Sequence, residues 1–513
     1  MKKYIIKTIS VIVILATTTI SCTDSFVDRE PVYSIDSENY FNSEQDYRDA
    51  LNGAYGLLHA SYINVLLGEI ASDNTLSGGE SANDTAGIQQ IDQMTHTVSN
   101  ANLKNIWDWM FAGVNRTNYI LEFKDKTDFV GKNQVIAETR FLRAYYNFEL
   151  VKWFGPIPLS GDKRFQLDDE KTIPRSSVSD VYVVIESDLL FAIDNLSAVP
   201  SQTGRATKGA AQALLGKAYL YQKKFVLASN VLEQVITSNT YSLVSNYGSI
   251  FENAGENGPE SVFEVQYTEA EGASFDCLQC SQGNVAVGFS GVRGFDGPSY
   301  TPGYSFNVPT TESFNAFEAG DKRRDVTVLD IKAFADLNPL WQNKPYLDAV
   351  SAGTTPLPPL GVLYGKGYKD TGYFNRKYIP RTRVAPIGDV NLTNPNNYRS
   401  IRYSDVLLMA AEAYNRGGIN DAKAVTYLNL VRRRAFGDLT HDISASGATL
   451  TDYIWAERRV ELMGEGHRFF DLVRTGKAAQ KITGFTANKN ELFPVPNEEI
   501  QFSNGNWQQN QGY

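Results

Sequence analysis

Two segments of this chain share a spacing of small and large side chains that is typical of helices packed in antiparallel pairs. The first copy lies within residues 207–237, and the second, with a turn one residue longer, lies within residues 410–428. The spacing matches tetratricopeptide repeats, in which small residues let two helices approach closely. The matching residues are Leu215, Gly216, Tyr219, Ala228 and Leu232 in the first copy, and Ala410, Ala411, Tyr414, Ala424 and Leu428 in the second. A scaffold of paired helices is therefore expected.

Further helices are predicted where apolar residues recur every three or four positions. These segments are residues 44–60, 102–123, 132–153 and 178–196. Together with the repeats, they predict a mostly α fold, in which a tetratricopeptide-like helical scaffold is built from residues 44–237 and 402–476.

Two long segments lack this helical periodicity. Residues 71–100 are rich in Gly, Ser, Asn and Asp, and residues 240–400 are punctuated by Gly and Pro, so both are predicted to be loop-rich. Residues 262–267 alternate in polarity like a short strand. The loop-rich segment 240–400 is expected to pack over the helical scaffold and to carry a ligand-binding surface, because binding residues often lie on loops held by a rigid scaffold.

The first 21 residues have the layout of a secretory signal peptide. Lys2, Lys3 and Lys7 precede an apolar stretch at residues 9–20. Cys22 follows at the expected cleavage point, which predicts a lipoprotein anchored through this residue, because two or more acyl chains hold a protein stably to a membrane. The expected organisation is a lipoprotein signal peptide at 1–21, a polar tether at 22–42 and one folded domain at 43–513.

The charge and the aromatic content of the chain narrow its expected ligands. The formal net charge is −10 for all 513 residues, and the predicted signal peptide holds three lysines and no acid, so the mature chain carries −13. An acidic balance argues against a nucleic-acid partner. The chain has 28 Tyr, 27 Phe and 6 Trp, and the flat faces of Tyr and Trp suit sugar stacking as well as a helical core.

Residues 453–477 form the most densely charged stretch near the C-terminal end of the scaffold. An apolar stripe on one helix is expected to comprise Tyr453, Ala456, Val460 and Met463, with Glu457, Arg458, Arg459 and Glu461 on the other side. Two glycines, Gly464 and Gly466, should end this helix, and a second helix should carry Arg468, Asp471 and Arg474 as an ion ladder. This pattern could form a catalytic cluster, but it favours a charge-paired corner that fixes two helices against each other.

The same stretch resembles the C-terminal signature of the SusD/RagB family. The similar residues are Glu457, Arg458, Arg459, Glu461, Leu462, Glu465, Gly466, Arg468, Asp471, Leu472 and Arg474. The end of the chain, with the strings FPVP at 493–496 and QNQGY at 509–513, is similar to the closing motif of that family, and residues 137–144 and 154–159 also look like the family pattern.

The resemblance implies a non-catalytic, surface-exposed outer-membrane lipoprotein. Members of the family act as a lid on a SusC-like, TonB-dependent transporter and deliver oligosaccharides to it. Within the same family, RagB-like members bind peptides, so uptake of peptides is the alternative. An enzyme is the least favoured class, and no cofactor is expected.

No sequence motif for catalysis or metal binding is evident. The HExxH, GxSxG and GxxxxGK motifs are missing, and His59, His96, His441 and His467 are isolated in the sequence. The single CxxC pair, Cys277 and Cys280, lacks the further ligands of a zinc site. In an exported protein it can form a local disulfide or remain as two free thiols.

The ligand is expected to lie between residues 71–100 and residues 285–346, the two longest stretches without helical periodicity. Sugar recognition needs an aromatic face for the apolar side of the ring and fixed polar groups for the hydroxyls. The candidate residues are Tyr300, Tyr304, Trp341 and Tyr346 for stacking, and Asp73 and Asn74 for hydroxyl contacts. Each of these aromatic residues could equally hold its own loop to the scaffold.

Overall fold

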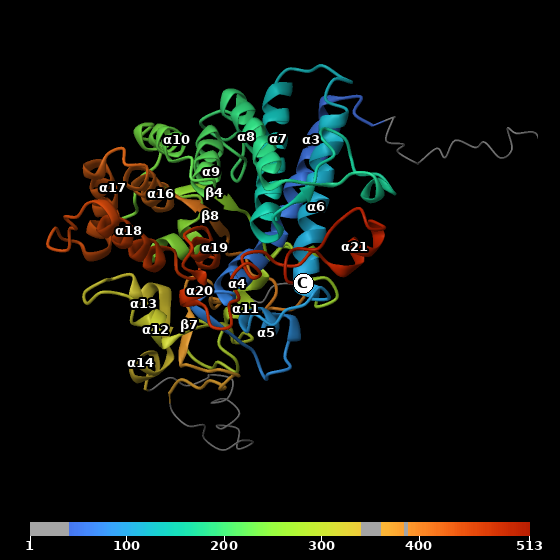
Figure 1. Cartoon of the computed structure of the whole chain (residues 1–513). Helices are drawn as coiled ribbons and strands as arrows, with labels where there is room; N and C mark the ends of the chain where they lie inside the picture. The colour runs from blue at the N-terminus through green and yellow to red at the C-terminus, as the bar shows by residue number, and fades with distance from the viewer. Residues whose placement is uncertain (1–39, 340–360, 384–387) are drawn as a thin grey trace, which may run out of the picture.

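The structure, a computed structural model, describes residues 40–339, 361–383 and 388–513. It is built mainly from helices that follow one another across the upper half of Figure 1. These helices are α3 (Glu44–Gly56), α6 (Ala101–Glu122), α7 (Lys132–Phe154), α8 (Val178–Asn195), α9 (Lys208–Tyr221), α10 (Phe225–Thr237), α16 (Tyr403–Arg416), α17 (Asp421–Phe436) and α18 (Gly447–Leu462). Each packs on the next, and α10 packs on α16 although a long segment separates them in sequence. The mostly α fold is confirmed.

Both predicted repeats are antiparallel helix pairs. The first is α9 with α10, and the second is α16 with α17. A Cβ atom added at Gly216 would lie 2.4 Å from a methyl carbon of Leu232 on the facing helix, and Ala228 is fully buried. The small residues therefore stand where the two helices touch, as the repeat spacing predicts.

Several predicted boundaries change in the structure. The helix predicted at 44–60 ends as α3 and continues through a 3-10 turn, η2 (Leu57–Ser61), into α4 (Tyr62–Ile70). All nine residues of α4 are buried. α4 has nine residues, fewer than the window over which helical periodicity is recognised, which is why the sequence pattern predicts no helix there.

Both loop-rich segments also contain short helices and strands. Residues 71–100 contain β1 (Thr75–Gly78) and α5 (Ala86–Asp92). The 240–400 segment contains β4 (Ser261–Val265), α11 (Val285–Ser290), β5 (Phe306–Pro309), α12 (Thr311–Phe314), α13 (Arg324–Thr327), β6 (Val328–Asp330), α14 (Ile331–Asp336), β7 (Tyr373–Asn375) and β8 (Tyr398–Arg402). These elements are shorter than the window over which periodicity becomes visible.

The strands pair in twos, and two of the pairs join distant segments. β1 pairs antiparallel with β5, which brings residues 75–78 against residues 306–309. β4, which confirms the strand predicted at 262–267, pairs with β8 at the start of α16. The first pair places the two segments that are expected to hold the ligand side by side.

The buried side of α18 differs from the predicted stripe. Tyr453 and Ala456 are exposed, whereas Glu457 and Glu461 are buried. Leu450 and Ile454 provide the apolar contacts in the first half of the helix. Val460 and Met463 of the predicted stripe are buried as expected, so the stripe is wrong only in its first half, and two carboxylates share the buried side of the helix.

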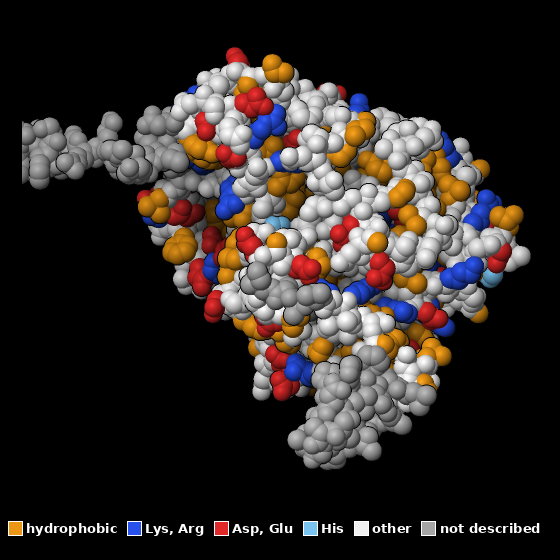
Figure 2. Space-filling model, turned by 180° about the vertical axis from the view of Figure 1, so that it is seen from behind, with side chains coloured by type: hydrophobic (Ala, Val, Ile, Leu, Met, Phe, Trp, Pro, Cys, Tyr) orange, Lys and Arg blue, Asp and Glu red, His pale blue; other side chains and the backbone are white. Residues whose placement is uncertain are grey.

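On the molecular surface, charges of both signs are mixed. Figure 2 shows acidic and basic side chains interspersed with apolar ones on one face, and the coloured residues there form no continuous basic field. Within the described residues, no helix has the length and apolar character needed to cross a bilayer.

Candidate functional site

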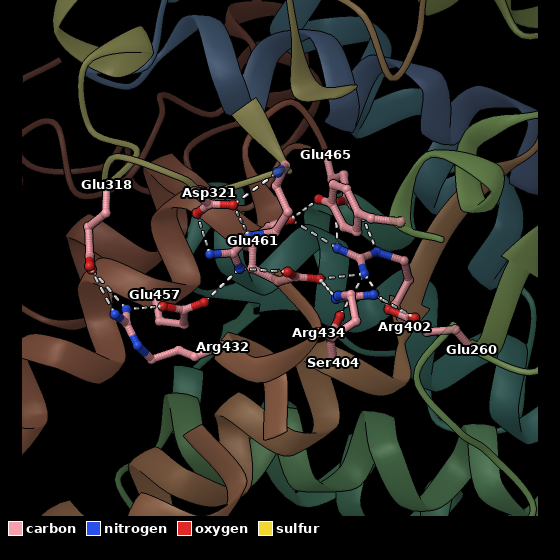
Figure 3. A network of polar contacts seen from close by, with 12 residues as sticks. Glu260, Glu318, Asp321, Arg402, Ser404, Arg432, Arg434, Glu457, Glu461 and Glu465 are labelled. Carbon is pink, nitrogen blue, oxygen red and sulfur yellow. Dashed lines mark hydrogen bonds and ion pairs between the residues drawn. The ribbon is translucent and has the colours of Figure 1, made fainter. Parts of the chain in front are cut away.

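The charged signature of α18 forms a buried ion network (Figure 3). Arg402, at the end of β8, donates to Glu461 and to Glu465 at 2.8 Å each. Arg323 donates to the second oxygen of Glu461 at 2.8 Å and to Glu457 at 2.6 Å. All five side chains are at most 1% exposed. The network continues through Glu260, Glu318, Asp321, Ser404, Arg432 and Arg434.

The electrostatics of this network are those of structural ion pairs. Burial alone would raise the pKa of Glu461, but the guanidinium groups of Arg434, Arg402 and Arg323 lower it well below its usual value. Removing one partner of a buried pair leaves an uncompensated charge and is strongly destabilising. The network joins α17, α18, β8 and the segment around residue 321, which confirms the charge-paired corner rather than a catalytic cluster.

The two glycines that follow α18 make the sharp turn that the sequence predicts. Gly464 and Gly466 adopt φ angles of +85° and +84°, which glycine tolerates far better than other residues. The turn packs tightly against α4, because a Cβ atom added at Gly68 would lie 2.3 Å from the carbonyl oxygen of Gly466. The N–H of Gly466 donates to the Glu69 carboxylate at 3.0 Å.

The structure gives Asp73 and Asn74 structural partners instead of leaving them open to a ligand. Asp73 accepts two hydrogen bonds from Arg468, at 2.7 and 2.8 Å. Burial alone would raise the pKa of Asp73, but Arg468 and Arg459 lower it below its usual value. Asn74 is fully buried and bonds to Glu69 and Arg459. Hydroxyl contacts from these two side chains stay a prediction, and both side chains already have protein partners.

The predicted aromatic residues separate into three groups. Tyr300 is 7% exposed and packs in a small apolar cluster, where its hydroxyl accepts a hydrogen bond from Arg376 at 2.8 Å. It therefore holds its own loop in place. Tyr304 is half-buried and remains accessible. Trp341 and Tyr346 lie outside the described residues.

Tyr304 lies at the centre of a set of aromatic and polar side chains that we call the Tyr304 surface, formed by Phe275, Tyr304, Arg293, Asp389 and Glu80. The ring of Tyr304 meets Phe275 edge to face at 5.6 Å between centroids. Its hydroxyl donates to Asp389 at 3.4 Å, and its carbonyl oxygen accepts from Arg293 at 3.2 Å. Arg293 also pairs with Glu80 at 3.4 Å.

The Tyr304 surface has the chemistry that a saccharide needs. Phe275 is 57% exposed, so most of its ring can meet the apolar face of a sugar. Asp389 and Glu80 offer hydroxyl acceptors, and Arg293 offers donors. Phe275, Arg293 and Asp389 were not predicted from the sequence, although Phe275, a large apolar residue in a polar loop, is the kind of signal that could have indicated its exposure.

A disulfide lies close to Phe275 in the sequence. Cys277 and Cys280 are bonded to each other, which decides between the two alternatives left open for this pair. The bond spans a short 3-10 turn, η6 (Leu278–Cys280), which begins three residues after Phe275.

Two of the histidines, His467 and His96, are buried and contact other side chains. His467 is buried beside Lys217, whose Nζ lies 3.3 Å from His467 Nδ1. His96 is buried beside Tyr513, with its Nε2 2.7 Å from the Tyr513 hydroxyl. The described residues contain no group of three or more side chains suited to hold a metal ion.

Comparison with known proteins gives matches to one protein family along most of the chain. A model described as "SusD family" matches residues 259–513, and one described as "Starch-binding associating with outer membrane" matches residues 25–220. The chain is 26% identical over 530 residues to SusD-like protein P38 of Formosa agariphila, covering 95% of this chain and 96% of the relative.

Two solved structures are similar over nearly the full length. A laminarin-binding SusD-like protein shares 32% identity and a TM-score of 0.80, over 92% of this chain and 100% of its own. Surface glycan-binding protein A from Bacteroides thetaiotaomicron, in complex with laminarihexaose, shares 25% identity and a TM-score of 0.76, over 91% and 99%. With this coverage, and with a fold built around the signature seen in its sequence, the chain belongs to the SusD family.

Proposed function

We propose that this protein is a non-catalytic lipoprotein of the outer membrane that binds neutral oligosaccharides of the laminarin type at the Tyr304 surface. The observation that carries the proposal is the pairing of an exposed ring, Phe275, with the half-buried ring of Tyr304 beside Asp389 and Arg293. Laminarin and laminarihexaose are named for two of the similar structures, which supports the choice of this glycan class.

Binding would use the two kinds of contact that the surface combines. The rings would cover the apolar C–H face of one sugar unit, and the charged groups would exchange hydrogen bonds with its hydroxyls. Hydrolysis would require an acid and a second carboxylate placed across a glycosidic bond. In the Tyr304 surface Glu80 and Asp389 each have a partner, Arg293 and Tyr304 respectively, which suits binding.

The bound oligosaccharide would be handed to a SusC-like, TonB-dependent transporter, while Cys22 anchors the chain to the membrane. The family resemblance carries this part of the proposal, together with the matched description that mentions the outer membrane. The similar proteins are named for glycans, and no observation favours the peptide alternative.

Calorimetric titration with laminarihexaose tests the binding function. Tyr304→Ala and Phe275→Ala should each weaken affinity by roughly tenfold or more, which is about 1.4 kcal/mol. Tyr304→Phe keeps the ring and loses only the hydroxyl contact to Asp389, so it should retain most of the affinity. Tyr453→Ala, which removes an exposed ring on α18, is the matched control and should bind like the wild type.

Two results would contradict the proposal. If folded Tyr304→Ala and Phe275→Ala both bind laminarihexaose as the wild type does, the site lies elsewhere. If the purified protein produces new reducing ends from laminarihexaose, and one carboxylate substitution abolishes this, the protein is an enzyme.

A further inference from the structure

A second pocket, lined by aromatic and polar side chains, lies on elements that contribute nothing to the Tyr304 surface. It is formed by α6, by residues 158–170 and by residues 499–507 near the C-terminus, and its volume is about 340 Å³. Figure 1 shows α21 (Asn497–Phe502) beside the lower half of α6. This volume is in the range of small-molecule sites.

The wall of this pocket is a chain of four rings. Trp107 meets Phe111 at 4.6 Å and Trp507 at 6.0 Å between centroids. Phe111 in turn meets Phe165 edge to face at 6.0 Å. Trp107 and Trp507 are almost fully buried, whereas Phe111 and Phe165 keep part of their surface open. The pocket therefore offers accessible aromatic surface on a rigid base.

Hydrogen bonds hold the three walls in place. The N–H of Phe165 donates to Asn115 Oδ1 at 2.8 Å, which fixes the 158–170 segment to α6. Trp507 Nε1 donates to the carbonyl oxygen of Ile173 at 2.8 Å, and Asn506 donates to the carbonyl oxygen of Glu170 at 2.9 Å. A pre-formed site loses little conformational entropy on binding.

The polar side chains of the pocket include both donors and acceptors. The described hydrogen bonds use only the Oδ1 atom of Asn115, so its Nδ2 group can donate to a ligand. The side-chain amide of Gln166 and the carboxylate of Glu170 make no hydrogen bond or ion pair within the described residues. Asp108 and Glu499 lie beside Lys104, whose Nζ is 2.7 Å from Asp108 and 3.8 Å from Glu499, and burial, followed by the charge of Asp108, raises the pKa of Glu499.

We infer that this pocket is a second saccharide site, which takes one neutral sugar unit of an oligosaccharide against Phe111 and Phe165. Amide donors and carboxylate acceptors around an aromatic wall match the hydroxyls and the apolar face of a pyranose. The inference rests on the proposed function for its ligand class, but it concerns a separate set of residues. Two sites on one chain would raise the apparent affinity for long glycans through effective concentration.

Calorimetry with laminarihexaose on the mature chain, at matched thermal stability, tests the inference. The wild type should show two binding events. The double variant Phe165→Ala, Gln166→Ala should lose one event, or weaken it at least tenfold, while the event that depends on Tyr304 stays. Leu167→Ala is the matched control, because Leu167 is the next residue, is 90% exposed and does not line the pocket; it should keep both events.

The possible outcomes separate the two sites. A single event that is lost in Tyr304→Ala and unchanged in the Phe165→Ala, Gln166→Ala variant overturns the second site and leaves the proposed function standing. A single event lost only in the Phe165→Ala, Gln166→Ala variant supports this pocket and refutes the Tyr304 surface. If laminarihexaose does not bind the wild type, the proposed function and the second saccharide site are both wrong. If this pocket instead binds a lysine-rich peptide and no sugar, the saccharide inference is wrong.

Discussion

Replacing Gly466 by alanine should destabilise the protein far more than the same change at Gly476. Both glycines have positive φ angles, +84° and +71°, so each alanine meets a backbone cost of about 1–2 kcal/mol. Only at Gly466 would the new Cβ atom collide with its surroundings, at 2.4 Å from the carbonyl oxygen of Asn64 and 2.9 Å from the Cα atom of Val65. At Gly476 nothing lies within 4 Å.

The collision at Gly466 cannot be relieved by turning a side chain. The atoms it meets belong to the backbone of α4, whose nine residues are all buried. Overpacking of this kind costs typically about 1–3 kcal/mol. Gly466→Ala should therefore lose roughly 2–5 kcal/mol of unfolding free energy, against roughly 1–2 kcal/mol for Gly476→Ala.

Urea unfolding of the mature chain, followed by circular dichroism at pH 7, measures both values. The difference between the two variants isolates the steric part, because the backbone cost is common to both. Gly68→Ala meets the same contact from the other side at 2.3 Å. Since Gly68 lies within α4 and has no positive φ angle, this variant should show the steric loss without the backbone cost. Equal losses in Gly466→Ala and Gly476→Ala would refute the close packing of this turn on α4.

Three further outcomes are expected. Cys22→Ala should move the protein out of the membrane fraction, and a variant that stays membrane-bound would exclude the lipid anchor. Ala228→Leu should cost about 1–3 kcal/mol by overpacking the contact between α9 and α10, and an unchanged melting temperature would argue against that contact. Burial and the neighbouring Lys217 lower the pKa of His467 to about 3. Below pH 6.5 the imidazole of His467 therefore binds a proton in the unfolded chain but not in the folded chain. The free energy of unfolding falls as the pH is lowered from 6.5. Between pH 7 and pH 5 the wild type should lose roughly 2 kcal/mol more than His467→Gln, and parallel stability curves would show that His467 is not responsible.

The helical scaffold could be predicted because each helix is encoded by the pattern of residues within its own segment. An amphipathic helix repeats its apolar residues within a window of about a dozen residues, so α6, α7 and α8 are visible in the sequence to within one or two residues. The contact of Gly216 with Leu232 was also predictable, because tetratricopeptide spacing encodes it between neighbouring helices. By contrast, α4 was missed, because its nine residues are fewer than that window.

The candidate site was predictable only as a region. The sequence indicated that residues 71–100 and 285–346 come together, and the β1–β5 pairing brings them side by side. It did not indicate which side chains face outward. Asp73 and Asn74 turn toward Arg468 and Arg459, because a carboxylate near buried guanidinium groups is more stable paired with them than facing solvent.

The sequence by itself determined the helix pairs, the turn at Gly464 and Gly466, and membership of the family, because each depends on short-range spacing. Only the tertiary structure decided that Glu461 is an interior residue, since its burial requires Arg402 and Arg323 from segments far away in the chain. It also decided that Phe275 meets Tyr304. Contacts of this kind depend on how separate segments pack, and no local periodicity encodes that packing.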